Sequence, residues 1–294
     1  MKPSITQVPR TATIRLRGWP FDLAATLGSG QVFHWHPWQD GFAGLIGEEP
    51  VFVAQPEPGR LVCSEGRENL VQHYLGLDHD MERIVSSFPQ DDTTLHTAIR
   101  WCPGLRLIRQ PAWECLATFI TSSLKQVPHI RQIALRLRER FGRRITAPGL
   151  PTQYSYPTPE AMAAAGESAL RACGLGYRAA FLERSAATVA AGDISLDEVA
   201  ALPDSEAAAA LCRLHGVGEK IAACALLFGW ERHGAFPIDV WIERALRELY
   251  FTKKRKVTAK RIRHFAITHF GPARGYAQQF LFHWARITGC GQKS

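Results

Sequence analysis

The sequence contains no long hydrophobic run and no cysteines at metal-ligand spacing. A membrane-spanning helix needs about 20 mostly apolar residues, and no stretch approaches that length. The first residues also lack the apolar core of a secretory signal. The seven cysteines are scattered, without a CxxC pair, which argues against a disulfide framework and fits a reducing compartment. We therefore expect a soluble intracellular protein.

Internal repeats and low-complexity linkers are absent as well. The 294 residues are 46% hydrophobic and 21% charged, a composition typical of a folded globular protein with two or three lobes. The formal net charge is +8, so the surface should favour polyanionic partners such as nucleic acid.

The first 104 residues contain short segments of alternating polarity, separated by Gly, Pro and Asp. Such alternation is typical of antiparallel strands that are buried on one face. We predict a β-rich N-terminal domain over residues 1–104, with a helix near Asn69–Leu75 and a hairpin turn at Gln39–Gly41. The predicted strands are Thr13–Arg17, Gln31–Trp35, Phe42–Ile46 and Val51–Ala54.

From residue 105 the hydrophobic period becomes helical. One apolar stripe consists of Ile130, Ile133, Ala134, Leu137 and Phe141. We predict a helical body over residues 105–294, and therefore an α+β protein that is mostly helical with a small antiparallel β-rich N-terminal domain. The predicted helices are Trp113–Leu124, Ile130–Phe141, Pro159–Gly174, Tyr177–Ala191, Ser205–Leu214, Glu219–Phe228, Val240–Tyr250, Thr258–Phe270 and Pro272–Thr288.

A two-glycine turn joins two of these helices within residues 211–228. Gly216 and Gly218 flank Val217 between apolar helical segments, which predicts a helix, a hairpin and a second helix. Glycines permit a positive φ and a close backbone approach, and the start of a helix offers free N–H groups that suit a phosphate. A purely structural corner between two helices fits the same pattern.

Lys220 opens the second helix, and Asp239 follows between Pro237 and an apolar segment. A lysine amine can attack C1′ of a nucleoside, expel the base and leave a Schiff base, while a carboxylate supports the cationic sugar or carries a proton. The plain alternatives are a solvated lysine in a first helical turn and an aspartate that only caps the next helix. Asp239 can cap the helix and take part in catalysis at the same time, because a capping carboxylate still projects from the start of the helix.

These residues carry a resemblance to a known family. Residues Leu211–Ile242 resemble the helix-hairpin-helix, glycine/proline-rich, aspartate (HhH-GPD) superfamily of DNA glycosylases. The segments Gly30–Trp35, Leu175–Ala179 and Gly275–Phe282 are similar to the 8-oxoguanine DNA glycosylase branch. They occur in family order and span nearly the whole chain. The resemblance implies an HhH-GPD body with a TBP-like N-terminal domain.

The resemblance also implies a nucleophile, Lys220, and an essential acidic partner, Asp239. It implies a base pocket whose members are Gly30, Cys224, Gln278 and Phe282. The carbonyl of a glycine can accept the N7 hydrogen of oxidised guanine and repel the N7 lone pair of guanine. Gln278 would bind the Watson–Crick edge, and an aromatic ring and a thiol would enclose the flipped base. The alternatives are a turn glycine for Gly30, a core aromatic for Phe282 and a small buried residue for Cys224.

Further positions are implied to contact DNA. The hairpin residues Gly216, Val217 and Gly218 would bind phosphate, and Arg178 would enter the DNA opposite the flipped base; a surface arginine at a helix start is the alternative. Relatives usually carry asparagines and an arginine after a Ser-Ser pair, to fill the duplex and read the orphan cytosine. At those positions this chain has Leu124, Lys125, Gln126 and His129.

No redox cofactor and no catalytic metal are expected from the resemblance. A loosely held structural cation at the hairpin carbonyls is left open. Relatives of the endonuclease III type end in four clustered cysteines that bind an iron–sulfur cluster, whereas Cys290 stands alone here, so no such cluster is expected. His34 and His36 lie on one predicted strand face without a third ligand in the sequence.

We therefore expect a monomeric base-excision-repair glycosylase that removes 8-oxoguanine from duplex DNA and cleaves the abasic site by β-elimination, and that is found with chromosomal DNA. Two alternatives remain at this point. A monofunctional alkylbase or adenine glycosylase would release a base without forming an imine. A non-catalytic helix-hairpin-helix protein would use the hairpin only to bind phosphates, with salt-sensitive affinity.

Overall fold

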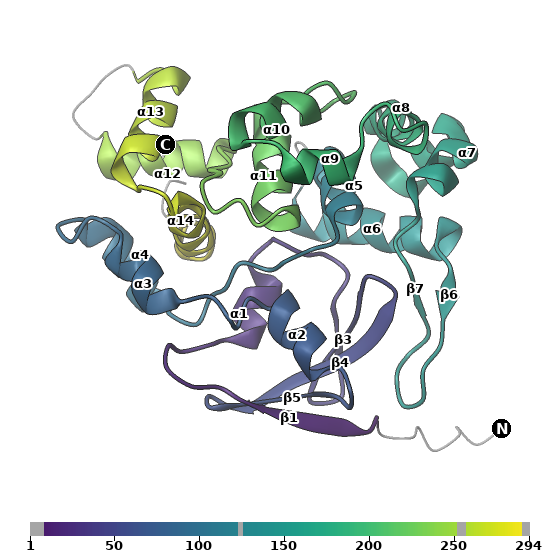
Figure 1. Cartoon of the computed structure of the whole chain (residues 1–294), viewed down its shortest axis with the longest axis horizontal. Coiled ribbons are helices and arrows are strands. Elements are labelled where there is room, and N and C mark those ends of the chain that lie inside the picture. The colour runs from purple at the N-terminus through teal and green to yellow at the C-terminus, as the bar shows by residue number, and fades with distance from the viewer. Residues whose placement is uncertain (1–8, 123–125, 252–256, 290–294) are drawn as a thin grey trace.

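The computed structural model describes residues 9–122, 126–251 and 257–289. A curved β-sheet carries helices α1 and α2 on one face, and a larger helical body lies above them (Figure 1). The expected α+β architecture is confirmed. No helix within the described ranges combines the length and hydrophobicity that crossing a membrane requires.

The N-terminal sheet has five antiparallel strands in the order β1-β5-β4-β3-β2. Its strands are β1 (Thr11–Arg15), β2 (His36–Trp38), β3 (Gly41–Ile46), β4 (Glu49–Glu57) and β5 (Arg60–Ser64). Three predicted strands overlap observed ones: Thr13–Arg17 overlaps β1, Phe42–Ile46 overlaps β3, and Val51–Ala54 overlaps β4. The predicted turn at Gln39–Gly41 joins β2 to β3. Strand β5 was not predicted; it is short, and Leu61 and Cys63 supply its fully buried side chains.

One predicted strand is wrong. Residues Gln31–Trp35 form an irregular buried segment, and the strand begins only at His36. The side chain of Gln31 ties this segment to a neighbouring coil. Its Nε2 donates to the carbonyl of Arg106 at 2.7 Å, and its Oε1 accepts from the N–H of Ile108 at 2.9 Å. These bonds satisfy two backbone groups of that coil and fix the position of Gln31.

Helices α1 (Leu23–Gly28) and α2 (Glu68–Tyr74) cover the sheet, and α2 confirms the helix predicted there. Trp35 lies between sheet and helix: its indole N–H donates to the Tyr74 hydroxyl at 3.0 Å. A Cβ at Gly44 would lie 2.4 Å from the Trp35 ring. Only glycine therefore leaves room for this ring against strand β3. This core fixes the irregular segment that carries Gly30.

The helical body overlaps every predicted helix. Its elements are α3 (Met81–Ser86), α4 (Thr93–Trp101), α5 (Ala112–Ser122), α6 (Val127–Phe141), the short strands β6 (Arg144–Ile145) and β7 (Gln153–Tyr154), α7 (Pro159–Leu170), the π-helical turn η1 (Arg171–Leu175), α8 (Arg178–Ala190), α9 (Leu196–Ala201), α10 (Asp204–Leu211), α11 (Glu219–Gly229), α12 (Val240–Tyr250), α13 (Ala259–His269) and α14 (Arg274–Thr288). In the predicted stripe of α6, all members but the half-buried Phe141 are buried.

Helices α1, α3, α4 and α9 were not predicted; α1, α3 and α9 have only six residues each, too few to show a hydrophobic period, whereas α4 has nine. Each nevertheless begins at a side chain that caps it by accepting a backbone N–H bond. The capping residues are Asp22, Asp80, Asp92 and Ser195. An N-cap residue is therefore the signal that would have located them.

Helices α3 and α4 pack into the core of the helical body. Leu95, Ala98 and Ile99 of α4 belong to the same buried cluster as residues of α11 and α14. The sheet and α2 have their own cluster. The predicted domain division at residue 104 stays a prediction.

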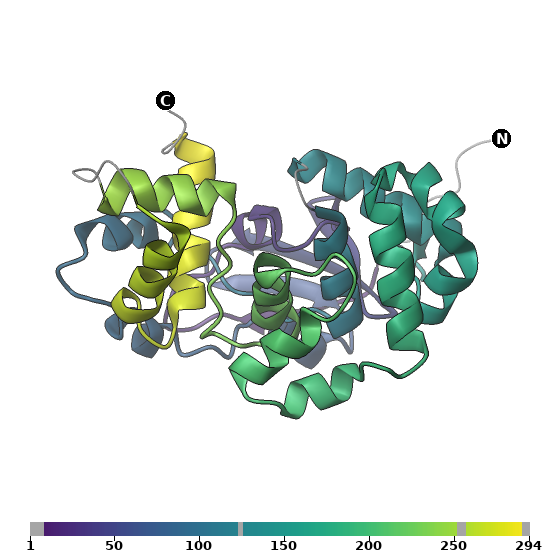
Figure 2. The same ribbon diagram turned by 90° about the horizontal axis from the view of Figure 1, so that it is seen from above.

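Helix α11 occupies the middle of the body, with α12–α14 on one side and α6–α8 on the other (Figure 2). It packs closely against α5, where a Cβ at Gly229 would lie 3.2 Å from that of Cys115. Its buried residues are Ile221, Ala222, Cys224, Ala225, Leu226, Leu227 and Phe228. Because α11 is enclosed along most of its length, the position of its N-terminal end is fixed by the core.

Candidate active site

The turn before α11 is held against α8. Gly216 has φ +78°, and a Cβ there would lie 2.5 Å from the Phe181 ring. Ser185 Oγ donates to the carbonyl of His215 at 2.9 Å. Val217 is buried beneath the turn. The predicted helix-hairpin-helix is therefore present, and glycine at position 216 is required by both conformation and space.

Gly218 differs from Gly216 in its surroundings. It is the N-cap of α11 and lies in extended backbone, with no side chain capping the helix. A Cβ at this position would meet nothing within 4 Å. The first N–H groups of a helix have no partner within the helix, and here no side chain caps them. This is the geometry that receives an anion at a helix N-terminus.

Lys220 lies in the first turn of α11 and is half-buried. Its Nζ lies 3.5 Å from Ser122 Oγ and 5.4 Å from the centre of the Phe119 ring, both on α5. Cys224, one turn further along α11, is 4% exposed. Burial raises the pKa of the Cys224 thiol to about 11, against the opposing effect of the Lys220 charge. The amine thus lies beside an aromatic ring and an uncharged thiol.

Asp239 is the N-cap of α12, as the capping interpretation predicted. Its Oδ1 accepts from the N–H of Ile242 at 2.8 Å. Burial raises the pKa of the Asp239 carboxyl, while the Ile242 N–H and then the Lys220 charge act in the opposite direction. The carboxylate is therefore a cap that also interacts electrostatically with the lysine.

Lys220 lies in the first turn of α11, and Asp239 is the N-cap of α12. Their charges act on each other, and both act on the thiol of Cys224. The structure therefore brings Asp239 within electrostatic reach of Lys220 and Cys224, which lie one turn apart on α11. A nitrogen nucleophile next to a carboxylate with a raised pKa is an arrangement for covalent chemistry with proton transfer.

Gly30 and Phe282 are also in contact. Gly30 has φ +88°, and a Cβ there would lie 3.3 Å from Cε1 of Phe282 and 3.2 Å from Nη1 of Arg286. Arg286 Nη2 donates to the carbonyl of Gly28 at 2.6 Å, and the guanidinium lies 5.6 Å from the centre of the Phe282 ring. Arg286 was missed in the sequence. The signal for it is its spacing of one helical turn after Phe282.

Gln278 lies one turn before Phe282 on α14 and is 5% exposed. Its Oε1 is buried and accepts no hydrogen bond from the described residues. The neighbouring Gln279 Nε2 lies 3.3 Å from the carbonyl of Ser29. An unpaired buried acceptor costs free energy, so Gln278 has an acceptor that a bound group could satisfy.

The predicted DNA-contacting residues outside the hairpin differ in their exposure to solvent. Gln126 and His129 are exposed at the start of α6, which follows Ser122 in the chain. Arg178 is only 4% exposed, and its guanidinium lies 4.3 Å from the centre of the Tyr177 ring. The neighbouring Tyr177 is 50% exposed. In this structure Arg178 is therefore an interior side chain, and its insertion into DNA stays a prediction that requires it to move. The other two predicted contacts, Leu124 and Lys125, lie outside the described residues.

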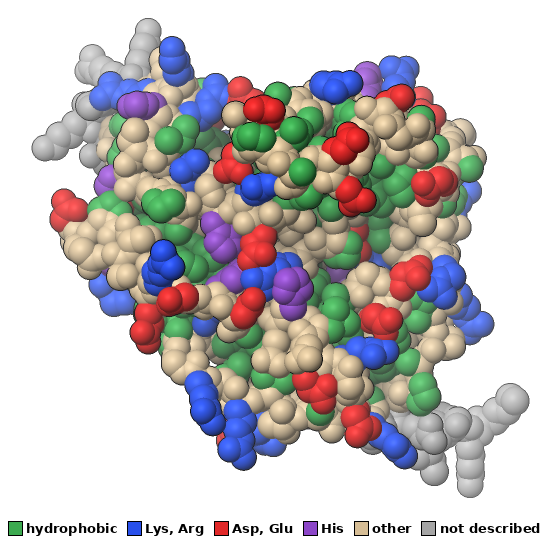
Figure 3. Space-filling view, in the orientation of Figure 1, with side chains coloured by type: hydrophobic (Ala, Val, Ile, Leu, Met, Phe, Trp, Pro, Cys, Tyr) green, Lys and Arg blue, Asp and Glu red, His purple; other side chains and the backbone are tan. Residues whose placement is uncertain are grey.

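Acidic and basic side chains are interspersed over the face in Figure 3, with blue Lys and Arg side chains most frequent in the corner that contains α13. Lys260, Arg261 and Arg263 are exposed on that helix. The positive net charge is therefore distributed over several elements.

Comparison with known proteins identifies the family. The model of the "HhH-GPD superfamily base excision DNA repair protein" matches residues 118–267, and that of the "8-oxoguanine DNA glycosylase, N-terminal domain" matches residues 13–116. The chain belongs to the HhH-GPD superfamily of base excision DNA repair proteins. It is thus an HhH-GPD enzyme that acts on DNA, and the matched region contains Lys220 and Asp239.

Similar proteins cover the chain almost completely. A probable N-glycosylase/DNA lyase of Methanothermobacter thermautotrophicus is 27% identical, over 92% of this chain and 95% of that protein. The structure of MBOgg1 in complex with a low-affinity DNA ligand has a TM-score of 0.88 and 31% identity, covering 98% of this chain and 100% of the other. The 8-oxoguanine glycosylase/lyase of Clostridium acetobutylicum, bound to DNA with cytosine opposite 8-oxoG, has a TM-score of 0.85 and 27% identity, covering 96% and 99%.

The two hairpin glycines should respond differently to alanine. Gly218→Ala adds a methyl group in open space, so we expect a loss of folding free energy below about 1 kcal/mol but roughly tenfold weaker DNA binding, since one charge-assisted hydrogen bond is obstructed. Gly216→Ala should cost about 2 kcal/mol or more, because the methyl group overlaps Phe181 at a positive φ. Urea unfolding and fluorescence anisotropy at fixed salt measure both quantities. Equal DNA affinity of Gly218→Ala and the parent would contradict the phosphate role.

Two substitutions of Asp239 should distinguish the effect of its N-cap hydrogen bond on stability from the effect of its negative charge. Asp239→Ala removes the hydrogen bond to α12 and should cost about 1 kcal/mol of unfolding free energy. Asp239→Asn keeps a good N-cap and removes a charge that burial disfavours, so at neutral pH its stability should equal or slightly exceed that of the parent. Urea denaturation tests this order. An asparagine variant as unstable as the alanine variant would contradict it.

Proposed function

We propose that this chain removes 8-oxoguanine from duplex DNA and then cleaves the strand at the abasic site. The observation that carries the proposal is the convergence of the Lys220 amine and the Asp239 carboxylate beside a hairpin with an open helix N-terminus. The similar glycosylase/lyases support the choice of substrate. The partner is lesion-containing duplex DNA, and the place of action is the compartment that holds chromosomal DNA.

The proposed reaction begins when the damaged nucleotide leaves the duplex, which costs a few kcal/mol of unstacking. The hairpin N–H groups at Gly218 bind a backbone phosphate and place the sugar over α11. The amine nitrogen of Lys220 attacks C1′ through its lone pair, and the bond from C1′ to the base breaks, with the electron pair leaving on the base, which then takes a proton from water. Asp239 stabilises the positive charge that develops on the sugar and accepts a proton from the attacking nitrogen.

Strand cleavage follows from the product of this attack. Opening of the sugar ring gives an imine between Lys220 and C1′, which makes the hydrogens on C2′ acidic. Removal of one of these protons expels the 3′ phosphate by β-elimination, and water then hydrolyses the imine and frees the lysine. The raised pKa of the Asp239 carboxyl suits a group that takes up and returns protons.

The oxidised base would be distinguished from guanine where Gly30 meets Gln278 and Phe282 of α14. The Gly30 carbonyl would accept the N7 hydrogen that only the oxidised base carries. The unpaired Oε1 of Gln278 is suited to accept from the N–H groups on the Watson–Crick edge. The Phe282 ring and the uncharged thiol of Cys224 would enclose the two faces of the base.

The remaining predicted features belong to the proposal as well. Gln126 and His129 contact the strand opposite the lesion, together with Leu124 and Lys125. The carbonyls of the hairpin hold at most a loosely bound cation, and neither a redox cofactor nor an iron–sulfur cluster takes part. The functional unit is a monomer.

Borohydride trapping tests the nucleophile. The parent protein should form a covalent adduct with duplex DNA that contains 8-oxoguanine, because borohydride reduces the imine to a stable amine. Lys220→Gln should form no adduct and release base roughly 10³-fold more slowly or worse, whereas Lys260→Gln should still be trapped. An adduct with Lys220→Gln would refute the assignment; base release by the parent without any adduct would indicate the monofunctional alternative.

The pH dependence of base release tests Asp239. If the carboxylate must be ionised, single-turnover rates should fall as the pH decreases through its pKa. Because burial raises that pKa, the acidic limb should lie above the ordinary value of 3.8. The rates are measured on protein that circular dichroism shows to be folded. A limb centred at or below 3.8 would contradict this role.

A further inference from the structure

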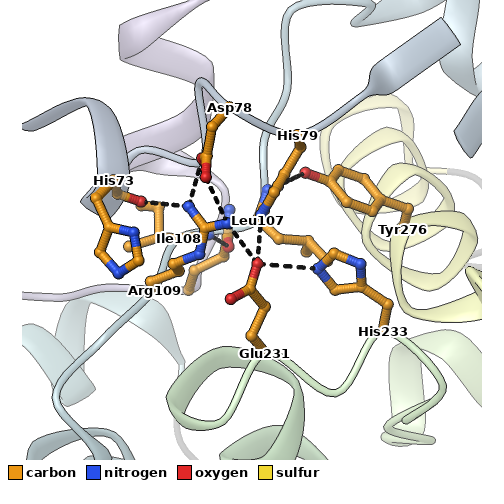
Figure 4. Close-up of polar contacts among 10 residues, drawn as sticks. His73, Asp78, His79, Leu107, Ile108, Arg109, Glu231, His233 and Tyr276 are labelled. Carbon is orange, nitrogen blue, oxygen red and sulfur yellow. Dashed lines mark hydrogen bonds and ion pairs between the residues drawn. The ribbon is translucent and has the colours of Figure 1, made fainter. Parts of the chain in front are cut away.

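A cluster of potential metal ligands lies away from the proposed active site. His79, Glu231 and His233 each present one ligand atom, and these atoms lie within 4.8 Å of one another. His79 lies between α2 and α3, whereas the other two lie in the loop between α11 and α12 (Figure 4). Histidine, acidic and basic side chains meet near the centre of the face in Figure 3.

Two of the three ligands are already oriented by outer partners. The Tyr276 hydroxyl hydrogen-bonds to His79 Nδ1, which leaves Nε2 directed at Glu231, 2.8 Å from its Oε1. Arg109 contacts the same Oε1 from another direction at 2.5 Å and is itself held by Asp78. Metal sites in proteins have this organisation, in which a second group fixes the orientation of each imidazole or carboxylate ligand.

The third ligand has an unused atom. His233 Nε2 is buried, has no hydrogen-bond partner among the described residues, and lies 3.9 Å from Glu231 Oε1.

The end of α11 places Glu231. This residue has φ +55° and follows the C-cap Trp230, where a left-handed residue commonly ends a helix. The N–H of Arg232 donates back to the carbonyl of Leu226 at 2.9 Å. Glu231 also lines a cavity of about 390 Å³.

We propose that His79 Nε2, His233 Nε2 and Glu231 Oε1 bind one divalent zinc-class cation, with water completing the coordination. Two imidazoles and one carboxylate are a ligand set that Zn²⁺ accepts. The ion would draw His233 Nε2 closer to Glu231 Oε1, separate the His79–Glu231 pair slightly, and join the segment before α3 to the loop that leads to Asp239. Arg109 opposes the added charge, but the carboxylates of Asp78 and Glu231 together carry two negative charges against its one.

Cobalt titration of the untagged full-length protein tests the site. All variants carry Cys212→Ser, because Cys212 is an exposed thiol that binds such metals on its own. We expect one equivalent of Co²⁺ to give visible absorption bands, and Zn²⁺ to displace it and raise the melting temperature. His233→Phe keeps the ring contacts of His233 with His79 and Tyr276 but offers no ligand atom. It should weaken binding at least tenfold.

Two further variants make the outcome decisive. His264→Ala removes an exposed histidine on α13 and should bind like the parent. Glu231→Gln should weaken binding as His233→Phe does. Metal-free melting temperatures show whether each variant is folded. Absence of a stoichiometric Co²⁺ complex in the parent, or equal binding by the parent and a folded His233→Phe, would overturn the proposal.

Discussion

The burial of α11 is the constraint on which the rest of the structure depends. This helix packs against α5 and turns its apolar residues toward the core on most sides. Its first turn is therefore placed by the whole body and not by local contacts alone. Lys220 lies beside the Phe119 ring because that core fixes both helices. The glycine turn before it packs closely against Phe181 and Ser185 of α8, which fixes the start of α11.

The N-terminal domain is connected to this core through buried polar groups. Arg138 of α6 forms an ion pair with Glu114 of α5, and His34 Nδ1 lies 3.2 Å from the same carboxylate. The other ring nitrogen of His34 lies 2.8 Å from the carbonyl of Leu45. A buried ion pair contributes specificity more reliably than stability. Here it sets the sheet domain against α5 and α6, and the same junction positions the segment that carries Gly30.

Helix α14 completes the arrangement from the opposite side. Gln279, Phe282 and Arg286 recur on one helical face and all contact residues 28–30. Gln278 lies beside this face with an unpaired acceptor. Gly275 also brings the start of α14 against Leu227 of α11. The proposed pocket thus draws on both domains, and it depends on their packing more than on any single element.

The sequence by itself determined the helical body, the hairpin and the candidate residues, because hydrophobic period, glycine turns and capping side chains are local signals. It also determined that Asp239 caps a helix, since that depends on the next three residues. Tertiary structure alone decided that Gln31–Trp35 is not a strand and that the Gln31 side chain is held by the backbone of Arg106 and Ile108. It likewise decided the burial of Arg178, the contact of Arg286 with the Gly30 segment and the cluster at Glu231. Those features join positions far apart in the chain, and no local pattern records which distant side chain will fill a given space.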